Sequence, residues 1–288
     1  MDVVKGSYDA ARRAELAAFL RTRREGIGPD EVGLAGGARR RTPGLRREEV
    51  AQLAGVGVTW YTWLEQGRPI NASTQVLDAV ARVLQLGSAE RWHLYRLADV
   101  PGVPRTTGRP QPLPADVLPV LDALEPNPAA VYDGKYDLLA ANESYAALFP
   151  QLAHADGHER NALWQLAVAE RDGNPVCSWD LAPPMIAIAR ANYARHVGEP
   201  EWTEWIDRLC AVSPDFAALW AEHRVAESVP TVKSFRCDDL GTVDARTTSF
   251  TVHGAPECRM IVYLPLTAAD AAKLEVLRAR LARTARPA

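Results

Sequence analysis

Between Arg39 and Arg68 the chain reads RRRTPGLRREEVAQLAGVGVTWYTWLEQGR, and this stretch decides the fold of the first part of the protein. Its spacing predicts two short helices joined by a tight turn, because apolar residues recur three and four positions apart on either side of Gly55. Glycine takes the left-handed conformation that a helix C-terminus commonly needs, so Gly55 is expected to end the first helix. We expect the second helix from Val58 to Gln66, with Tyr61 and Leu64 facing the first.

This arrangement predicts a helix-turn-helix, whose second helix enters the major groove and meets base edges with its N-terminal residues. Threonine hydroxyls can bond to base edges, and valine or threonine methyl groups can touch a thymine methyl. Arginines beside such a helix suit phosphate contacts or the minor groove. We therefore expect DNA contacts from Val58, Thr59, Thr62, Trp63, Arg39, Arg40, Arg41, Arg46 and Arg47. The alternative is an ordinary αα-hairpin inside a helical domain.

The same stretch resembles a known family. Ala51, Gly55-Val56, Leu64-Glu65 and Gly67 match the pattern of Xre/Cro-type helix-turn-helix regulators, and the longer string is similar to the MmyB-like branch of these regulators. One difference is Gly57, where the wider family usually has a serine N-cap; because glycine is a tolerable cap, the cost is roughly a few tenths of a kcal/mol. The resemblance implies a lambda-repressor-like domain of five helices.

The flanking residues supply the other helices of this domain. An amphipathic pattern predicts a helix over residues 11–26, and Ser73 and Ser88 are expected to cap two further helices. The segment from Pro101 to Pro114 is dense in proline and glycine and reads as a linker. We therefore predict an all-α DNA-binding domain over residues 1–100, a linker over 101–114 and a second domain over 115–288.

Charge supports this division of the 288 residues. The net charge of −3 combines a balance of +5 in residues 1–110 with a balance of −8 in the remainder. A basic first part suits DNA, whereas the phosphate backbone would repel the acidic second part.

The composition also argues against several classes of protein. The sequence contains no run of 18 apolar residues, so we do not expect a membrane span. The N-terminus lacks the apolar core of a signal peptide. The four cysteines form no C-x-x-C pair, which is typical of reduced thiols in a cytoplasmic protein. His154 and His158 lie four apart in a polar, glycine-containing segment without further ligands, so we expect neither a metal nor a cofactor. No nucleophile elbow, phosphate loop or dinucleotide fingerprint is present, and we do not expect an enzyme.

The second part shows the pattern of an α+β domain. A helix over 115–124 precedes two short strands, which Asp133-Gly134 divides with a hairpin-turn signal, and Asn142 then opens a helix. A long helical section follows. Three strand-like runs over residues 231–237, 241–254 and 258–266 come before a terminal helix. We predict a PAS-like domain with a five-stranded antiparallel sheet and a helical insert between its second and third strands.

The resemblance to MmyB-like regulators continues here, at Asn142, at Ser213-Pro214-Asp215-Phe216 and from Leu219 to His223. The sequence departs from the family pattern at Phe235-Arg236-Cys237-Asp238, where the family tends to carry His-Pro after Phe-Arg. The resemblance implies a PAS-like domain that binds a small hydrophobic ligand such as a long-chain fatty acid, with no other cofactor.

A sensor of this kind needs apolar lining residues and a few polar groups, and a buried carboxylate would need a cation or several donors. The candidates are Trp164, Met185, Ile188, Arg190, Asn192, His196, Trp205, Phe216 and Trp220, with Arg195 as a further cation. Each is equally compatible with an ordinary core or surface position.

Three functions remain open for the second part. It is a ligand sensor, a module that only pairs two DNA-binding domains, or an enzyme. A helix-turn-helix half-site usually needs a partner, so we expect a homodimer on double-stranded DNA in either of the first two cases. A sensor changes its DNA affinity or melting temperature with ligand, a dimerisation module does not, and an enzyme consumes the compound.

Overall fold

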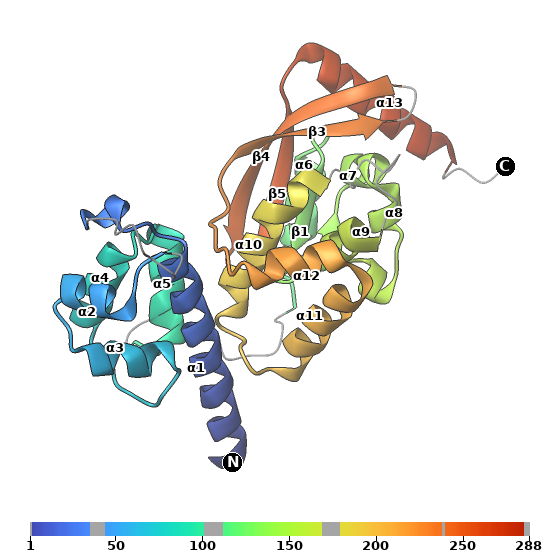
Figure 1. Cartoon of the computed structure of the whole chain (residues 1–288). Helices are drawn as coiled ribbons and strands as arrows, with labels where there is room; N and C mark the ends of the chain where they lie inside the picture. The colour runs from blue at the N-terminus through green and yellow to red at the C-terminus, as the bar shows by residue number, and fades with distance from the viewer. Residues whose placement is uncertain (1, 35–43, 101–111, 169–178, 238–239, 285–288) are drawn as a thin grey trace. The chain divides into compact units, whose positions relative to one another are not determined.

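The computed structural model describes residues 2–34, 44–100, 112–168, 179–237 and 240–284 (Figure 1). Arg39, Arg40 and Arg41 lie outside these ranges. The chain forms two compact units. The first contains residues 1–107, 193–208 and 218–227, and the second contains residues 108–192, 209–217 and 228–288.

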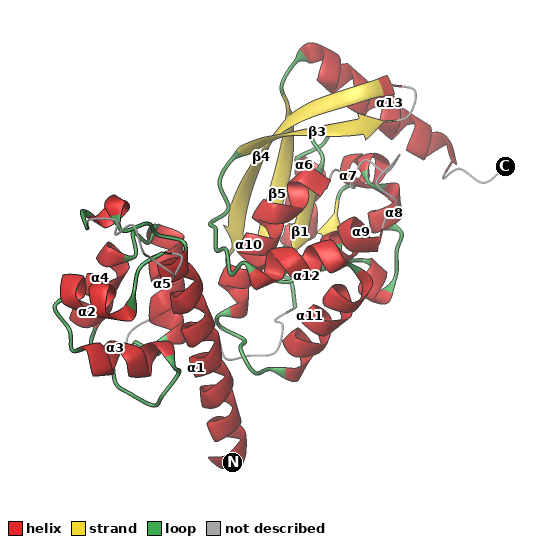
Figure 2. Ribbon diagram, viewed as in Figure 1, coloured by secondary structure: helices red, strands yellow, loops and turns green. Residues whose placement is uncertain are grey.

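Five helices make up the N-terminal part of the first unit, as the sequence predicts. They are α1 (Asp2–Glu25), α2 (Arg47–Ala54), α3 (Val58–Glu65), α4 (Thr74–Val83) and α5 (Ser88–Leu97), with a short 3-10 turn at Asp30–Val32 (Figure 2). Helix α1 is longer than predicted, and α3 ends one residue earlier.

In the turn between α2 and α3, both glycines take the conformations that the sequence predicts. Gly55 has φ +68°, the left-handed conformation, and ends α2, while Gly57 is extended and precedes α3 as its N-cap. At the start of α2 the Glu49 carboxylate accepts a hydrogen bond of 2.7 Å from the backbone N–H of Arg46. The acidic first turn therefore satisfies a donor that the helix itself leaves without a partner.

Of the two predicted serine caps, one is confirmed and one is wrong. Ser73 Oγ accepts from the backbone N–H of Val76 at 3.4 Å and caps α4. Ser88 is the first residue of α5 rather than its cap; Gly87 holds the cap position, and its backbone N–H donates to the Glu90 carboxylate at 3.0 Å. Because the Glu90 carboxylate reaches back three residues to this N–H, the cap position falls at Gly87.

The core of the first unit is formed by large apolar side chains from all five helices and by two small ones from later in the chain. Phe19, Leu20, Val50, Tyr61 and Leu77 are fully enclosed in it. Ala194 and Val197, in the 193–208 segment, belong to the same cluster.

The second unit contains the predicted five-stranded antiparallel sheet, with strand order β2-β1-β5-β4-β3 (Figure 1). The strands are β1 (Ala129–Tyr132), β2 (Leu138–Ala141), β3 (Thr231–Cys237), β4 (Gly241–Val252) and β5 (Ala255–Pro265). The last hairpin turns earlier than predicted, because Val252 already pairs with Ala255.

Eight helices follow residue 112 among the described residues. They are α6 (Val117–Ala123), α7 (Glu143–Leu148), α8 (Pro150–Ala153), α9 (Ala162–Val168), α10 (Ala182–Tyr193), α11 (Pro200–Val212), α12 (Pro214–Ala221) and α13 (Ala268–Thr284), with 3-10 turns at Gly157–Glu159 and Trp179–Leu181. As predicted, a helical section separates β2 from β3. The boundary between the two compact units falls within α11 and again within α12, so each of these helices contributes residues to both units.

Asn142 joins the first hairpin to α7. Its Oδ1 accepts from the backbone N–H groups of Ala129 and Tyr145, both at 3.0 Å, and its Nδ2 donates to the carbonyls of Leu121 and Asn127. One buried amide therefore ties together β1, α6 and α7, since it satisfies backbone groups of all three segments.

The two faces of the sheet differ in character. On the outer face, Val131 and Met260 are cross-strand partners and pack with Val117 and Leu121 of α6. On the inner face, Tyr132 and Tyr263 meet Tyr145 of α7.

Candidate nucleic-acid interface and ligand site

Helix α3 has one buried side and one exposed side. Tyr61 and Leu64 are buried, as the spacing predicts, whereas Val58 and Trp63 are 42% and 40% exposed. Thr59 is also exposed and Thr62 is half-buried. The exposed side therefore combines two hydroxyls with apolar atoms, which is the combination that base edges and thymine methyl groups can contact.

A buried carboxylate fixes α3 to the helices beside it. Glu65 has no exposed surface, and it accepts from Arg24 Nε at 2.7 Å, from Arg24 Nη2 at 2.8 Å and from Arg47 Nε at 2.9 Å. Arg24 also donates through Nη1 to the Leu45 carbonyl at 2.7 Å. Burial would raise the pKa of Glu65, but the hydrogen bonds and charges of the two arginines outweigh it and lower that pKa.

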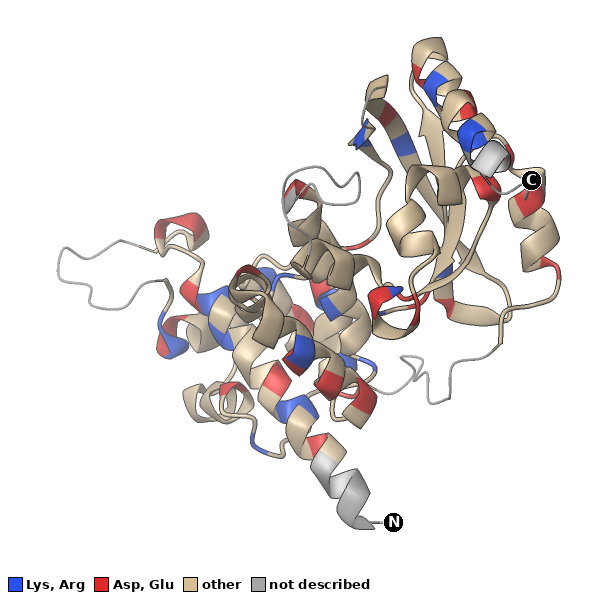
Figure 3. Cartoon of the chain, turned by 90° about the vertical axis from the view of Figure 1, so that its right-hand side faces the viewer, with Lys and Arg blue, Asp and Glu red and all other residues tan. Residues whose placement is uncertain are grey.

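This network was missed at the sequence level, where Glu65 appears only as part of a motif. It gives Arg47 a structural role besides the phosphate contact expected of it, because Arg47 Nε already donates to Glu65. Arg46, by contrast, is exposed at the start of α2 and forms no side-chain ion pair among the described residues. Figure 3 shows that basic and acidic residues are interspersed on these helices.

The residues expected to line a ligand site fall into two groups. In the second unit, Phe216 and Arg190 are almost fully buried, Met185 is buried, and Ile188 is half-buried. In the same unit, Trp164 meets the His158 ring edge-on at 4.6 Å, and Asn192 Nδ2 donates to the Gly134 carbonyl at 3.1 Å. Arg190 is therefore held inside the domain, and the half-buried Asn192 is tied to the turn between β1 and β2.

The remaining candidates belong to the first unit. Trp205 and Trp220 meet edge-on at 6.4 Å between ring centroids. The His196 ring stacks on Trp202 at 4.7 Å, and its Nδ1 lies 3.0 Å from a carboxylate oxygen of Glu199. These aromatic residues contact one another, and Tyr193, which also packs against the core of the first unit, contacts both Trp202 and Trp220.

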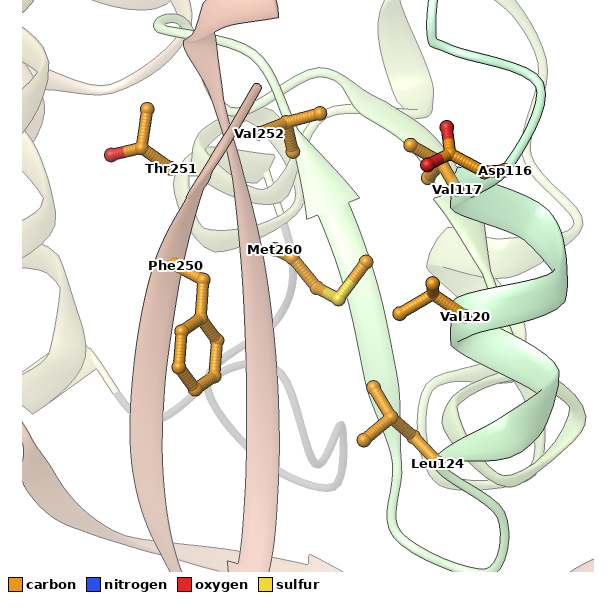
Figure 4. Close-up of a pocket in the computed structure, with 8 residues that line it drawn as sticks. All are labelled: Asp116, Val117, Val120, Leu124, Phe250, Thr251, Val252 and Met260. Carbon is orange, nitrogen blue, oxygen red and sulfur yellow. The ribbon is translucent and has the colours of Figure 1, made fainter.

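An apolar groove lies on the outer face of the sheet. It has a volume of about 350 Å³ and runs between α6 and the β4–β5 hairpin, where Val120 and Leu124 point toward Met260 (Figure 4). Phe250, at its rim, is 56% exposed. The lining contains one carboxylate and no cation: Asp116, Val117, Val120, Leu124, Phe250, Thr251, Val252 and Met260.

The inner face carries a cluster of tyrosines that the sequence analysis did not single out. The hydroxyls of Tyr132 and Tyr145 are hydrogen-bonded to each other, and burial raises the pKa of both phenols well above the ordinary value. Tyr263 lies beside Tyr145, with ring centroids 6.0 Å apart. These hydroxyls stay protonated at neutral pH and serve as neutral hydrogen-bonding groups.

Two basic side chains share the inner face with these tyrosines. Lys233 is the cross-strand partner of Ala245, and Arg259 is the partner of Tyr132. The Arg259 guanidinium lies 5.3 Å from the centre of the Tyr136 ring. Side chains alternate between the two faces along β3 and β5, so the sequence could have placed Lys233 on the face of Phe235 and Arg259 on the face of Tyr263. A charged residue in a strand is usually expected to be exposed to solvent, however.

Across the described residues, no three His, Cys, Asp or Glu side chains come together in a way that could hold a metal ion. None of the helices in the same ranges has both the length and the apolar character that a membrane crossing needs.

A five-helix bundle with an exposed second helix of a helix-turn-helix, followed by an α+β unit with a ligand-sized apolar groove, defines a DNA-binding regulator with a second, sensory domain. Comparison with protein families agrees. A helix-turn-helix domain family matches residues 15–94, and the MmyB-like transcription regulator ligand binding domain matches residues 113–277, more than half of the chain. The chain belongs to the MmyB-like transcription regulators. No curated protein matches it.

Proposed function

We propose that this transcription regulator reads double-stranded DNA with the exposed side of α3 and responds to a small hydrophobic molecule such as a fatty acid. It acts in the cytoplasm as a homodimer. The DNA-binding part spans residues 1–100 and the sensory part spans residues 115–288, joined by residues 101–114.

The observation that carries the DNA-binding half is the division of α3 into a fixed side and a free side. Glu65, Tyr61 and Leu64 fix the helix, while Val58 and Thr59 at its N-terminal end remain exposed. The N-terminal residues of a recognition helix are those that meet base edges. Arg46 and Arg39 to Arg41 supply phosphate contacts in this proposal.

The sensory half is supported by the match of residues 113–277 to the family's ligand-binding domain. Ligand binding changes DNA affinity when the ligand favours one arrangement of the two DNA-binding parts over another. Such coupling is typically about 1–3 kcal/mol, or roughly a 5- to 150-fold change in affinity for the operator.

The test begins with mass spectrometry of organic extracts from freshly purified full-length protein. A stoichiometric apolar compound is expected, and adding it to delipidated protein should shift both the melting temperature and the affinity for operator DNA. An extract without such a compound, together with DNA binding that no fatty acid alters, would favour a second domain that only pairs the DNA-binding parts.

A further inference from the structure

Helix α3 ends in a turn that brings two exposed side chains together, one aromatic and one basic. Gly67 has φ +68°, and its backbone N–H donates to the Leu64 carbonyl at 3.1 Å. The N–H of Arg68 donates to the Trp63 carbonyl at 3.0 Å. These two hydrogen bonds form the Schellman motif, which sets the side chains at positions 63 and 68 against each other. The Arg68 guanidinium accordingly lies over the Trp63 ring, 5.7 Å from its centre.

The backbone of this turn is fixed against α1. The Gly67 carbonyl accepts from Arg13 Nε at 3.2 Å, and a Cβ atom at Gly67 would come within 2.8 Å of the Arg13 carbonyl oxygen. Glycine is required here both for the left-handed backbone and for the close approach to α1. Because the turn is fixed and the Trp63 ring lies beneath the guanidinium, the direction of Arg68 is restricted before it meets any partner.

The charge of Arg68 has no counter-ion in the part of the chain that the structure describes. Arg68 is exposed, and it pairs with no carboxylate among those residues. Glu65, the acidic residue of α3, is engaged by Arg24 and Arg47. An apolar contact usually accompanies this motif, so a charged residue in its place needs a reason. A cation near a helix C-terminus also stabilises the helix, and the test has to separate that role from binding.

The pair lies on the side of α3 that the proposed function places on DNA. Val58, Thr59 and Trp63 are all exposed, and Trp63 lies one helical turn beyond Thr59 on the same side. A helix rises about 1.5 Å per residue, so the end of α3 at Gln66 is roughly 10 Å along the axis from Thr59. The major groove is about 12 Å wide, so a helix whose N-terminal residues meet base edges brings its other end to the phosphates that border the groove.

We propose that Arg68 binds a DNA phosphate at the border of the major groove and that Trp63 positions its guanidinium rather than contacting a base itself. The inference rests on the proposed DNA-binding function and assigns the contact at the C-terminal end of α3. The sequence analysis expected a direct DNA contact from Trp63 and gave Arg68 no role. Arginine suits this task because its planar guanidinium stacks on an aromatic ring and still presents N–H groups to a phosphate.

The test measures binding of full-length protein to two duplexes of equal length, one of A·T pairs and one of G·C pairs, by fluorescence anisotropy. Over roughly 50 to 200 mM salt, Arg68→Gln should lower the slope of log affinity against log salt by about 0.9. The affinity lost in this variant should therefore shrink by about 3.5-fold between the two salt concentrations. The effect should be equal on both duplexes, because phosphates carry no sequence information.

The role of Trp63 is measured on the same duplexes. Trp63→Leu should weaken binding by roughly 2- to 5-fold when Arg68 is present and should have no further effect in Arg68→Gln. Trp63→Phe keeps an aromatic ring beneath the guanidinium and should retain most of the affinity. A ring that contacts the bases directly would cost affinity in Arg68→Gln as well.

Two matched substitutions serve as controls. Trp92→Leu removes another exposed indole from the first unit, and Arg246→Gln removes an exposed guanidinium from β4. Both should bind DNA as the wild type does. Thermal unfolding of each variant shows whether it is folded. A lower melting temperature of Arg68→Gln with an unchanged salt slope would make Arg68 a helix-stabilising residue only and overturn the inference.

The remaining outcomes separate this inference from the function on which it rests. A loss of affinity on only one of the two duplexes would overturn the phosphate contact and leave DNA binding by α3 intact. Additive losses in the double variant would overturn the positioning role of Trp63. A wild type that binds neither duplex at about 50 mM salt would count against the DNA-binding function itself.

Discussion

The buried Glu65 carboxylate offers the sharpest test of how the recognition helix is held. Glu65→Gln keeps the size of the side chain but removes its charge, and Arg24, which is 6% exposed, then keeps a buried charge with only the half-exposed Glu25 carboxylate beside it. Breaking a buried pair by removing one partner costs about 3–5 kcal/mol. The three short hydrogen bonds from Arg24 and Arg47 place Glu65→Gln within that range.

The matched control acts on the same arginine. Glu25 lies 3.2 Å from Arg24 Nη2, but its side chain is 46% exposed. Exposed ion pairs contribute about 0–1 kcal/mol, so Glu25→Gln should be nearly neutral. Replacing both buried partners together, with Arg24→Met and Glu65→Leu, should cost less than Glu65→Gln alone, because no buried charge then remains unpaired.

Native-state hydrogen exchange measures the loss of stability separately for each segment. A segment-by-segment measurement is needed because the chain has two units. In Glu65→Gln, peptides covering residues 47–66 should exchange roughly 100- to 4,000-fold faster, since each 1.4 kcal/mol is about tenfold. Peptides from β4 and β5 should be unchanged. The reasoning fails if Glu65→Gln and Glu25→Gln accelerate exchange equally, or if the sheet peptides respond as strongly as those of α3.

Three further outcomes are expected. Thr59→Ala or Thr62→Ala should relax sequence preference in operator titrations while leaving non-specific DNA binding nearly unchanged; equal losses on all sequences would remove them from base readout. Replacing residues 39–41 by alanine should weaken binding to every DNA and flatten the dependence on salt by about one unit of slope per lost contact, and an unchanged slope would exclude that loop from the interface. Burial, and then the neighbouring charge of Asp137, raise the pKa of Asp133 to about 7, so stability present below the unfolded value of 3.8 is lost as pH rises through 7. Asp133→Asn should therefore raise the melting temperature more at pH 8 than at pH 5, and a uniform shift would contradict this.

Local chemistry in the sequence predicted the helix-turn-helix well. Gly55 and Gly57 take the conformations expected of a helix stop and a helix cap, and the spacing of Tyr61 and Leu64 identified the buried side of α3. These features depend on residues within one turn of each other, where backbone preference and helical period decide the structure.

Contacts between distant residues could not be predicted in this way. Arg24 is 41 positions from Glu65, and no local pattern shows that the two pair in the core. The same holds for Lys233 and Arg259: strand alternation assigns a face, but only the pairing of β3 with β4 and of β4 with β5 shows that both basic residues lie on the same face of the sheet. A charged residue in a strand is usually exposed, so its residue type alone does not indicate such a position.

Ala194 and Val197 lie late in the chain but belong to the core of the DNA-binding helices. This affects how the protein can be re-engineered. Consider a gene fusion that is joined within residues 101–114 and attaches the sensory half to another DNA-binding domain. It would separate helices α1 to α5 from Ala194 and Val197, which complete their core. Such a hybrid would expose apolar surface on one side of the junction and leave a void on the other. An exchange of specificity between relatives should therefore replace side chains on the exposed side of α3 and keep the chain otherwise whole.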